Sequence, residues 1–123
     1  MISSLTRCED YVMMLAGEKL RVALVTIHCS LREVPLLLSK EKVYKTISVT
    51  SRALQRDFGV KRPRIAVAAL NPHAGEEGLF GKEEEEVIRP AIQKAKADGH
   101  QVEGPFPADS LFFRAAGGEF DAV

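Results

Sequence analysis

The chain has 123 residues, a length that allows one domain with a modest hydrophobic core. Its hydrophobic fraction of 46% is that of an ordinary globular protein, and 17 basic residues balance 17 acidic ones, which argues against a general nucleic-acid binder. No apolar run is long enough for a membrane helix, no secretory signal is visible and two cysteines are too few for a disulfide framework, so we expect a cytoplasmic protein without membrane contact.

The first predicted elements are two short strands followed by a helix. Residues 11–15 (YVMML) and 20–27 (LRVALVTI) are apolar runs separated by a glycine-containing turn, which predicts a hairpin whose second strand is buried. Ser39 has the character of an N-cap, and the helix it starts is expected to run to about Phe58 and to stop at Gly59.

The second half of the chain alternates strands with helices. In order, the pattern predicts a strand at 64–70, a loop at 71–82, a helix at 83–98, a strand at 100–103, a Pro-rich loop at 104–107, a helix at 108–114 and an apolar strand that starts at 120. This alternation indicates an α/β layered fold with a largely parallel sheet. Because the chain stops at the start of an apolar strand, we expect residues 1–123 to form a single, incomplete domain.

Two of the three histidines directly follow predicted strands. His28 ends the stretch LVTIH, and His73 lies in LNPHAGEEGLFGKEEEE. The carboxyl ends of parallel strands meet at one edge of a sheet, so the two imidazoles could form part of a catalytic metal site. Each histidine also has a plainer interpretation, since His73 could cap a turn and His28 could be an ordinary polar residue at a strand end.

The loop around His73 combines flexible and acidic residues. Asn71, Gly75, Gly78 and Gly81 are expected to shape it, because glycine permits tight turns and close ligand approach. The acids at 83–86 would repel a phosphate at the helix start. We therefore interpret them as solvated side chains that interact favourably with the helix dipole.

A third stretch, GPFPADSLFF, places an acid near the start of a short helix. Asp109 or Ser110 could be the N-cap of that helix, and this is the interpretation that the residue types favour. Asp109 could instead be a site carboxylate that orients a histidine or accepts a proton.

Three motifs together go beyond a fold class. The strings VALVTIHCSLREV, LNPHAGEEGLFGKEE and GPFPADSLF closely resemble the 4-hydroxythreonine-4-phosphate dehydrogenase family of vitamin B6 biosynthesis, including its relatives that act on threonate or erythronate phosphates. The resemblance runs from about Tyr11 to the end of the chain. It implies a three-layer α/β/α fold related to isocitrate and isopropylmalate dehydrogenases, and a homodimer with its active site at the subunit interface.

The resemblance also implies a chemistry and its residues. The family oxidises a phosphorylated hydroxy acid with NAD(P), and the product then loses carbon dioxide on the route to pyridoxal phosphate. A divalent metal (Zn, Mg, Co or Mn) is held by three histidines, of which His28 and His73 match two. Asp109 matches an active-site acid, and no NAD-binding residue is expected within this chain.

Some expected residues are absent from the sequence. The third metal histidine of the family lies beyond the position of Val123, so we expect weak metal binding and no turnover from these 123 residues alone. Several motif positions also differ, namely Cys29, Ser30, Glu77, Leu79 and Phe80. The alternative is a truncated, non-catalytic homologue that serves as a dimerising or small-molecule- or metal-binding module.

Overall fold

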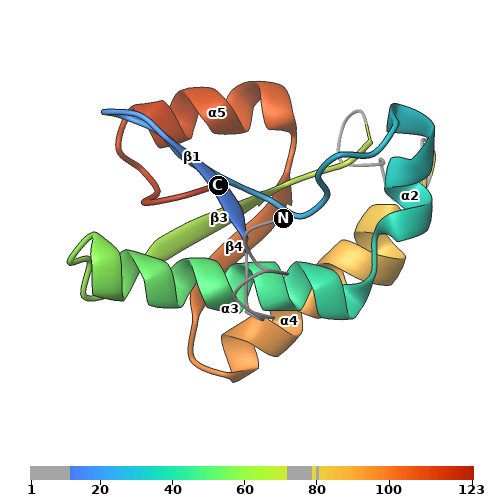
Figure 1. The fold of residues 1–123 in the computed structure, drawn as a ribbon. Helices are drawn as coiled ribbons and strands as arrows, with labels where there is room; N and C mark the ends of the chain where they lie inside the picture. The colour runs from blue at the N-terminus through green and yellow to red at the C-terminus, as the bar shows by residue number, and fades with distance from the viewer. Residues whose placement is uncertain (1–11, 72–78, 80) are drawn as a thin grey trace, which may run out of the picture.

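The computed structural model describes residues 12–71, 79 and 81–123, which form an α/β fold (Figure 1). In chain order the elements are β1 (Met13–Ala16), β2 (Arg21–Leu24), η1 (Leu31–Glu33), α2 (Val34–Leu37), α3 (Lys40–Asp57), β3 (Arg64–Ala68), η3 (Glu84–Ile88), α4 (Arg89–Ala97), β4 (Gln101–Phe106) and α5 (Ala108–Ala116). The alternation of strands and helices predicted from the sequence is confirmed.

The strands form two pairs that the end of the chain joins. β1 and β2 make the predicted antiparallel hairpin, while β3 and β4 are parallel. Ala122 forms a parallel bridge to Ile65 of β3. On its other side, Val123 donates its N–H to the Arg21 carbonyl (2.9 Å) and accepts the Ala23 N–H (2.8 Å), a pattern typical of parallel pairing. The largely parallel sheet is therefore confirmed, with β1 as its antiparallel edge.

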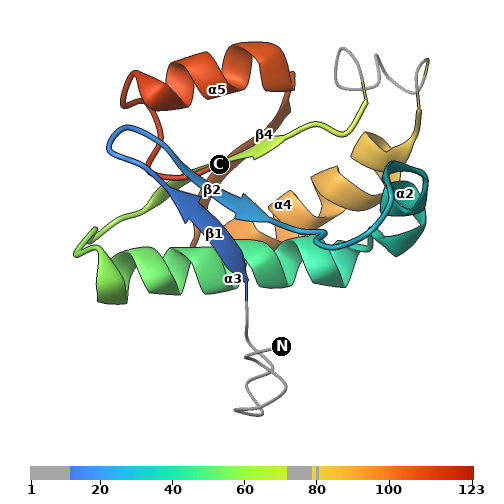
Figure 2. The ribbon, with the colours of Figure 1, turned by 45° about the horizontal axis from the view of Figure 1, so that its top comes forward.

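Helices cover both faces of this sheet. Figures 1 and 2 show α3 and α4 on one face and α5 on the other, which gives the three layers of a partial α/β/α domain. Among the described residues, no helix is long and apolar enough to cross a membrane.

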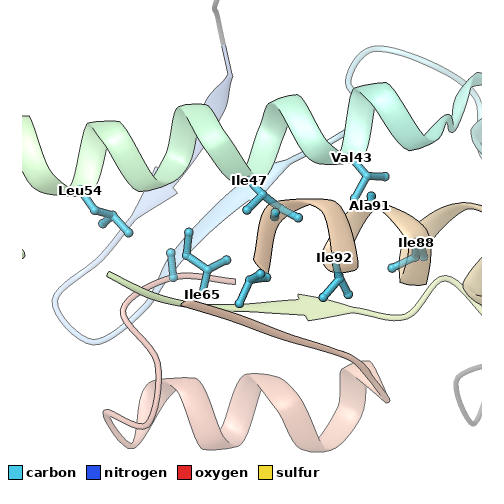
Figure 3. Close-up of a cluster of buried hydrophobic side chains, with 10 residues drawn as sticks. Val43, Ile47, Leu54, Ile65, Ile88, Ala91 and Ile92 are labelled. Atoms are coloured by element: carbon cyan, nitrogen blue, oxygen red, sulfur yellow. The ribbon is translucent and has the colours of Figure 1, made fainter. Parts of the chain in front are cut away.

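The core lies between the sheet and the layer formed by α3 and α4 (Figure 3). Aliphatic side chains at helical spacing on both helices point toward the sheet, as the sequence periodicity predicts. The buried cluster comprises Val43, Ile47, Leu54, Ile65, Ile88, Ala91, Ile92, Ala95, Val102 and Ala122. On the opposite face, Leu111 and Ala115 of α5 are also buried.

α3 begins and ends where the sequence predicts. The Ser39 Oγ accepts the N–H of Lys42 at 3.1 Å, as an N-cap should. The helix ends at Asp57, and Gly59 follows with φ of +68°. A positive φ is the conformation that glycine adopts most readily, so Gly59 is a suitable stop.

Several strand predictions need correction, beginning with β3, which ends at Ala68 instead of Leu70. β2 ends at Leu24 instead of Ile27, and its four residues are half-buried. β4 runs to Phe106, through the stretch predicted as a Pro-rich loop. The register passes from Ala66↔Glu103 to Ala68↔Phe106, so β4 contains a bulge that absorbs one extra residue.

Gly104 makes this bulge possible. Its φ is +134°, and a Cβ at this position would lie 2.6 Å from the Val67 carbonyl oxygen of β3. The backbones of β3 and β4 can therefore lie this close together only because residue 104 has no side chain.

The helix predicted over 83–98 forms, but its first turn is wider than an α-turn. Residues Glu84–Ile88 form a π-helix, which continues directly into α4. Pro90 follows the wide turn. Proline has no N–H to donate and its ring would crowd the Glu86 carbonyl in a regular α-helix, so the wide turn relieves a clash within the helix.

Candidate active site

The residues singled out from the sequence follow three strands that end at one edge of the sheet. Figures 1 and 2 show the segments after β2 and β3 and the start of α5 at this edge. His28 follows β2, Asn71 follows β3 and Asp109 follows β4. Thr26 and Leu70, which precede His28 and Asn71 in the chain, both line a cavity of about 260 Å³.

His28 has an unusual backbone conformation. It lies beyond the end of β2, in the turn before η1, and its side chain is exposed. Its φ is +54°, and it is the one non-glycine residue with positive φ among those that the structure describes. A left-handed conformation costs energy for a residue with a Cβ, and such residues are concentrated at functional sites. This signal could not be read from the sequence.

His73 lies outside the described residues, as do Gly75 and Gly78. The predicted roles of these three residues therefore stay predictions. Within residues 12–71, 79 and 81–123, no three histidine, cysteine, aspartate or glutamate side chains come together as a metal site. The described part of the edge therefore contributes His28 alone to the predicted set of metal ligands.

Glu84 follows the segment that contains His73 and bonds back to the residues that precede it. Its side chain is fully buried, and its Oε2 accepts the backbone N–H groups of Leu70 and Asn71, both at 2.8 Å. Its Oε1 accepts the side-chain Nδ2 of Asn71 at 2.8 Å. The prediction that all four acids of this stretch are solvated is therefore wrong for Glu84.

Asn71 and Gly81 complete this anchor. Asn71 Nδ2 also donates to Glu83 Oε1 at 2.7 Å, so the amide uses both of its hydrogens on neighbouring carboxylates. Gly81 packs against the Asn71 side chain so closely that a Cβ at residue 81 would overlap its amide group. These contacts bring Asn71 and Gly81 together, and their predicted role in shaping the loop stays a prediction.

The hydrogen bonds keep the buried carboxylate ionised. Burial alone would raise the pKa of Glu84, but the hydrogen bonds from Asn71 and from the backbone of Leu70 outweigh it and lower the pKa below 4.5. The sequence did contain a signal for this residue. Glu84 precedes Ile88 by one helical turn and shares the face of Ile88, Ala91 and Ala95, whereas Glu85 and Glu86 fall on exposed positions.

Asp109 does not cap α5. The N-cap is Pro107, and no side chain caps the helix. The Oδ1 of Asp109 accepts the N–H of Ser110 at 2.8 Å, and the Ser110 Oγ donates to the Pro107 carbonyl at 3.3 Å. The N-cap prediction is therefore wrong. Asp109 is an exposed acid in the first turn of the helix, where the helix dipole favours its negative charge.

Comparison with known proteins places this arrangement in a family. The family model described as "Pyridoxal phosphate biosynthetic protein PdxA" matches residues 1–123. The chain belongs to the PdxA family. The 4-hydroxythreonine-4-phosphate dehydrogenase of Desulforapulum autotrophicum is 52% identical over 123 residues, which cover 100% of this chain and 36% of that protein.

Solved structures of similar dehydrogenases share this fold. The crystal structure of 4-hydroxythreonine-4-phosphate dehydrogenase from Klebsiella pneumoniae superimposes with a TM-score of 0.95 at 44% identity, over 99% of this chain and 37% of that one. A terephthalate 1,2-cis-dihydrodiol dehydrogenase from Burkholderia xenovorans gives a TM-score of 0.84 at 32% identity, over 93% of this chain and 36% of that one. This chain thus spans about a third of the length of its PdxA relatives and has an α/β dehydrogenase fold.

Proposed function

We propose that this chain is the part of a 4-hydroxythreonine-4-phosphate dehydrogenase, or of an enzyme for a related phosphorylated hydroxy acid, that supplies two metal-binding histidines. The observation that carries the proposal is the strained backbone of His28 at the carboxyl edge of the sheet, at a position that matches a family ligand. Membership of the PdxA family supports the same reaction class. Residues 1–123 would form one incomplete domain of that enzyme.

The proposed metal ligands in this chain are His28 and His73. The exposed imidazole of His28 has the donor chemistry that zinc and cobalt favour, and oxygen ligands from substrate and water would also suit manganese or magnesium. A divalent metal bound there would act as a Lewis acid that lowers the pKa of the substrate hydroxyl. The third histidine of the proposed site is not among these 123 residues.

Asp109 is proposed as the acid of the site. Its carboxylate is exposed at the start of α5, at the same edge as His28, and its hydrogen bond to Ser110 uses one oxygen. The other oxygen can accept a proton or orient an imidazole. NAD(P), when bound to the complete enzyme, supplies the hydride acceptor for oxidation of the hydroxyl carbon, and loss of carbon dioxide follows from a β-keto acid product.

The relatives that match this chain also bear on its partners. The 4-hydroxythreonine-4-phosphate dehydrogenases point to a phosphorylated hydroxy acid as substrate. The family resemblance implies a homodimer whose active site lies at the subunit interface. We therefore propose a homodimer in which each subunit contributes part of the metal site.

A chimeric enzyme tests the proposal. Residues 1–123 would replace the matching 37% of the Klebsiella pneumoniae dehydrogenase, and NADH formation on 4-hydroxythreonine 4-phosphate would be measured. We expect an active chimera in which His28→Ala lowers metal-dependent turnover by more than about 100-fold, because a ligand is lost.

The matched control is His100→Ala, which removes a half-buried histidine just before β4, at the opposite edge of the sheet. This variant should keep its turnover. Full activity of the His28→Ala chimera would contradict the assignment of His28 as a ligand. An inactive chimera that nevertheless folds and dimerises would contradict the proposed substrate class.

A further inference from the structure

Glu84 is a buried ionisable residue to which the proposed reaction assigns no role. It lies in a run of four glutamates, and it is the only one of the four whose side chain has no exposed surface. Removing a carboxylate from water is costly, and an aliphatic side chain at this position would avoid that cost. The groups that Glu84 binds, rather than the packing of the core, therefore account for a carboxylate here.

Glu84 binds the two residues that follow the β3 segment at the carboxyl edge of the sheet. Its Oε2 accepts the N–H groups of Leu70 and Asn71, and its Oε1 accepts the Asn71 Nδ2, each at 2.8 Å. Ala69, one residue earlier, still donates its N–H to the Phe106 carbonyl of the neighbouring segment at 2.8 Å. Glu84 thus extends the restraint on this segment from the sheet to both the backbone and the side chain of residue 71.

The element that carries Glu84 is itself fixed in the core. Glu84–Ile88 is a π-helix, a form that is frequent at functional sites, and it continues directly into α4. Ile88 and the α4 residues Ala91 and Ile92 belong to the buried cluster between the helices and the sheet. A carboxylate on a packed helix is a fixed reference point, so the residues that it binds are held relative to the core.

The residues that Glu84 holds lead along the chain to a proposed metal ligand. Figures 1 and 2 show that the segments after β2 and β3 reach the same edge of the sheet, and His28 follows β2. His73 is two residues after Asn71 in the sequence, so peptide geometry alone keeps their Cα atoms within about 7.6 Å of each other. Whatever fixes Asn71 therefore limits where the imidazole of residue 73 can be placed.

We propose that Glu84 is a positioning residue of the metal site. By holding Asn71 against the core, it restricts His73 to positions from which this histidine can share a metal ion with His28. The inference rests on the proposed function, in which both histidines are ligands. It adds a residue that touches neither metal nor substrate and acts only through its hydrogen bonds to Leu70 and Asn71.

Cobalt binding to the chimeric enzyme tests the proposal without relying on turnover. Co²⁺ would be titrated into the metal-free chimera at a temperature where circular dichroism shows each variant to be folded, and its visible absorption would be recorded. We expect Glu84→Gln to raise the dissociation constant for Co²⁺ at least about tenfold and to change the absorption spectrum, because a support of a metal ligand is lost. Glu86→Gln removes the same charge from an exposed position and should bind Co²⁺ as the unmodified chimera does.

An exchange of donor and acceptor separates the hydrogen bonds from the charge. In the triple variant Asn71→Asp, Glu83→Gln, Glu84→Gln, the amide at position 84 can accept the two backbone N–H groups and donate to the carboxylate at position 71. Position 83 is included because Glu83 Oε1 lies 2.7 Å from Asn71 Nδ2 and would repel a carboxylate there. One carboxylate remains among the three positions, as in Glu84→Gln alone. We expect the triple variant to regain the cobalt affinity and the spectrum of the unmodified chimera.

The outcomes distinguish this inference from the proposed function. His28→Ala should weaken Co²⁺ binding, because a ligand is lost. If His28→Ala weakens binding and Glu84→Gln does not, the positioning role is overturned and the proposed metal site stands. Equal losses in Glu84→Gln and in the triple variant would also overturn the positioning role, since the restored hydrogen bonds would have no effect. Unchanged binding in His28→Ala would overturn the proposed metal site and the positioning role with it.

Discussion

Glu84 is a negative charge at a position with no exposed surface, and its surroundings explain why it is tolerated. Burial of a carboxylate is costly unless hydrogen bonds replace its water. Here the backbone N–H groups of Leu70 and Asn71 and the amide of Asn71 do so. The residue therefore joins the end of the β3 segment to the start of the following helix by bonds that require a full carboxylate with two acceptor oxygens.

Replacement of Glu84 by glutamine should destabilise the protein by about 1–3 kcal/mol. Glutamine can still accept the two backbone N–H groups, but its NH₂ would then face the NH₂ of Asn71, so two donors would meet. Glu86→Gln is the matched control, because Glu86 is exposed, and should change stability by less than about 0.5 kcal/mol. Urea unfolding measures both, and equal effects of the two variants would contradict this account.

The same carboxylate should make stability depend on pH. The pKa of Glu84 in the folded chain lies below its usual value of 4.5, so the group stabilises the fold at pH values above 4.5. This contribution is lost as the pH falls through the lower, folded pKa. The difference in unfolding free energy between wild type and Glu84→Gln should thus be constant near neutral pH and shrink in acid below 4.5. A difference independent of pH would exclude an ionised Glu84.

The burial, backbone conformation and role of individual residues could be predicted from the sequence to different extents. The helical phase that Glu84 shares with Ile88 marks it as buried, although a run of four glutamates suggests a solvated turn. The left-handed backbone of His28 could not be read from the sequence, because most histidines have negative φ even though histidine is enriched among the exceptions. For Asp109, the sequence alone did not show which residue caps α5. The prolines before the helix made its first residue hard to predict.

Among the elements, α3 shows most directly how a local sequence signal determines a boundary. Ser39→Ala should cost about 1 kcal/mol, since the Lys42 N–H would lose its partner at the helix start. Ser30 precedes η1 in the same kind of position but makes no side-chain cap bond, so Ser30→Ala is a matched control with little expected effect. Thermal unfolding distinguishes them, and a larger loss for Ser30→Ala would contradict the capping argument.

Elements were predictable where local signals agree with packing. The hairpin, β3 and α4 follow from apolar periodicity and from glycine-containing turns. β4 was predicted too short because Gly104 and Pro105 usually end a strand, and here a bulge opposite Val67 accommodates them. The π-turn before Pro90 was likewise invisible to a pattern that assumes regular helical spacing.

At the scale of the whole molecule, the sequence predicted the fold class but not the order of strands. Alternating elements indicate a parallel sheet, yet they do not say which strands are neighbours. The position of the hairpin is fixed by contacts distant in sequence. These include the pairing of Arg21 and Ala23 with Val123, and a hydrogen bond from the Arg21 guanidinium to the Asp121 carbonyl at 3.1 Å.

The anchor of Glu84 has a consequence for protein engineering. Two of its three bonds are to peptide N–H groups, which every residue except proline provides. The bond at position 70 therefore does not depend on the side chain there, while position 84 needs its carboxylate. A designer could exchange the residues between Asn71 and Gly81 for a foreign loop and retain both attachment points, so long as Asn71, Gly81 and Glu84 are kept.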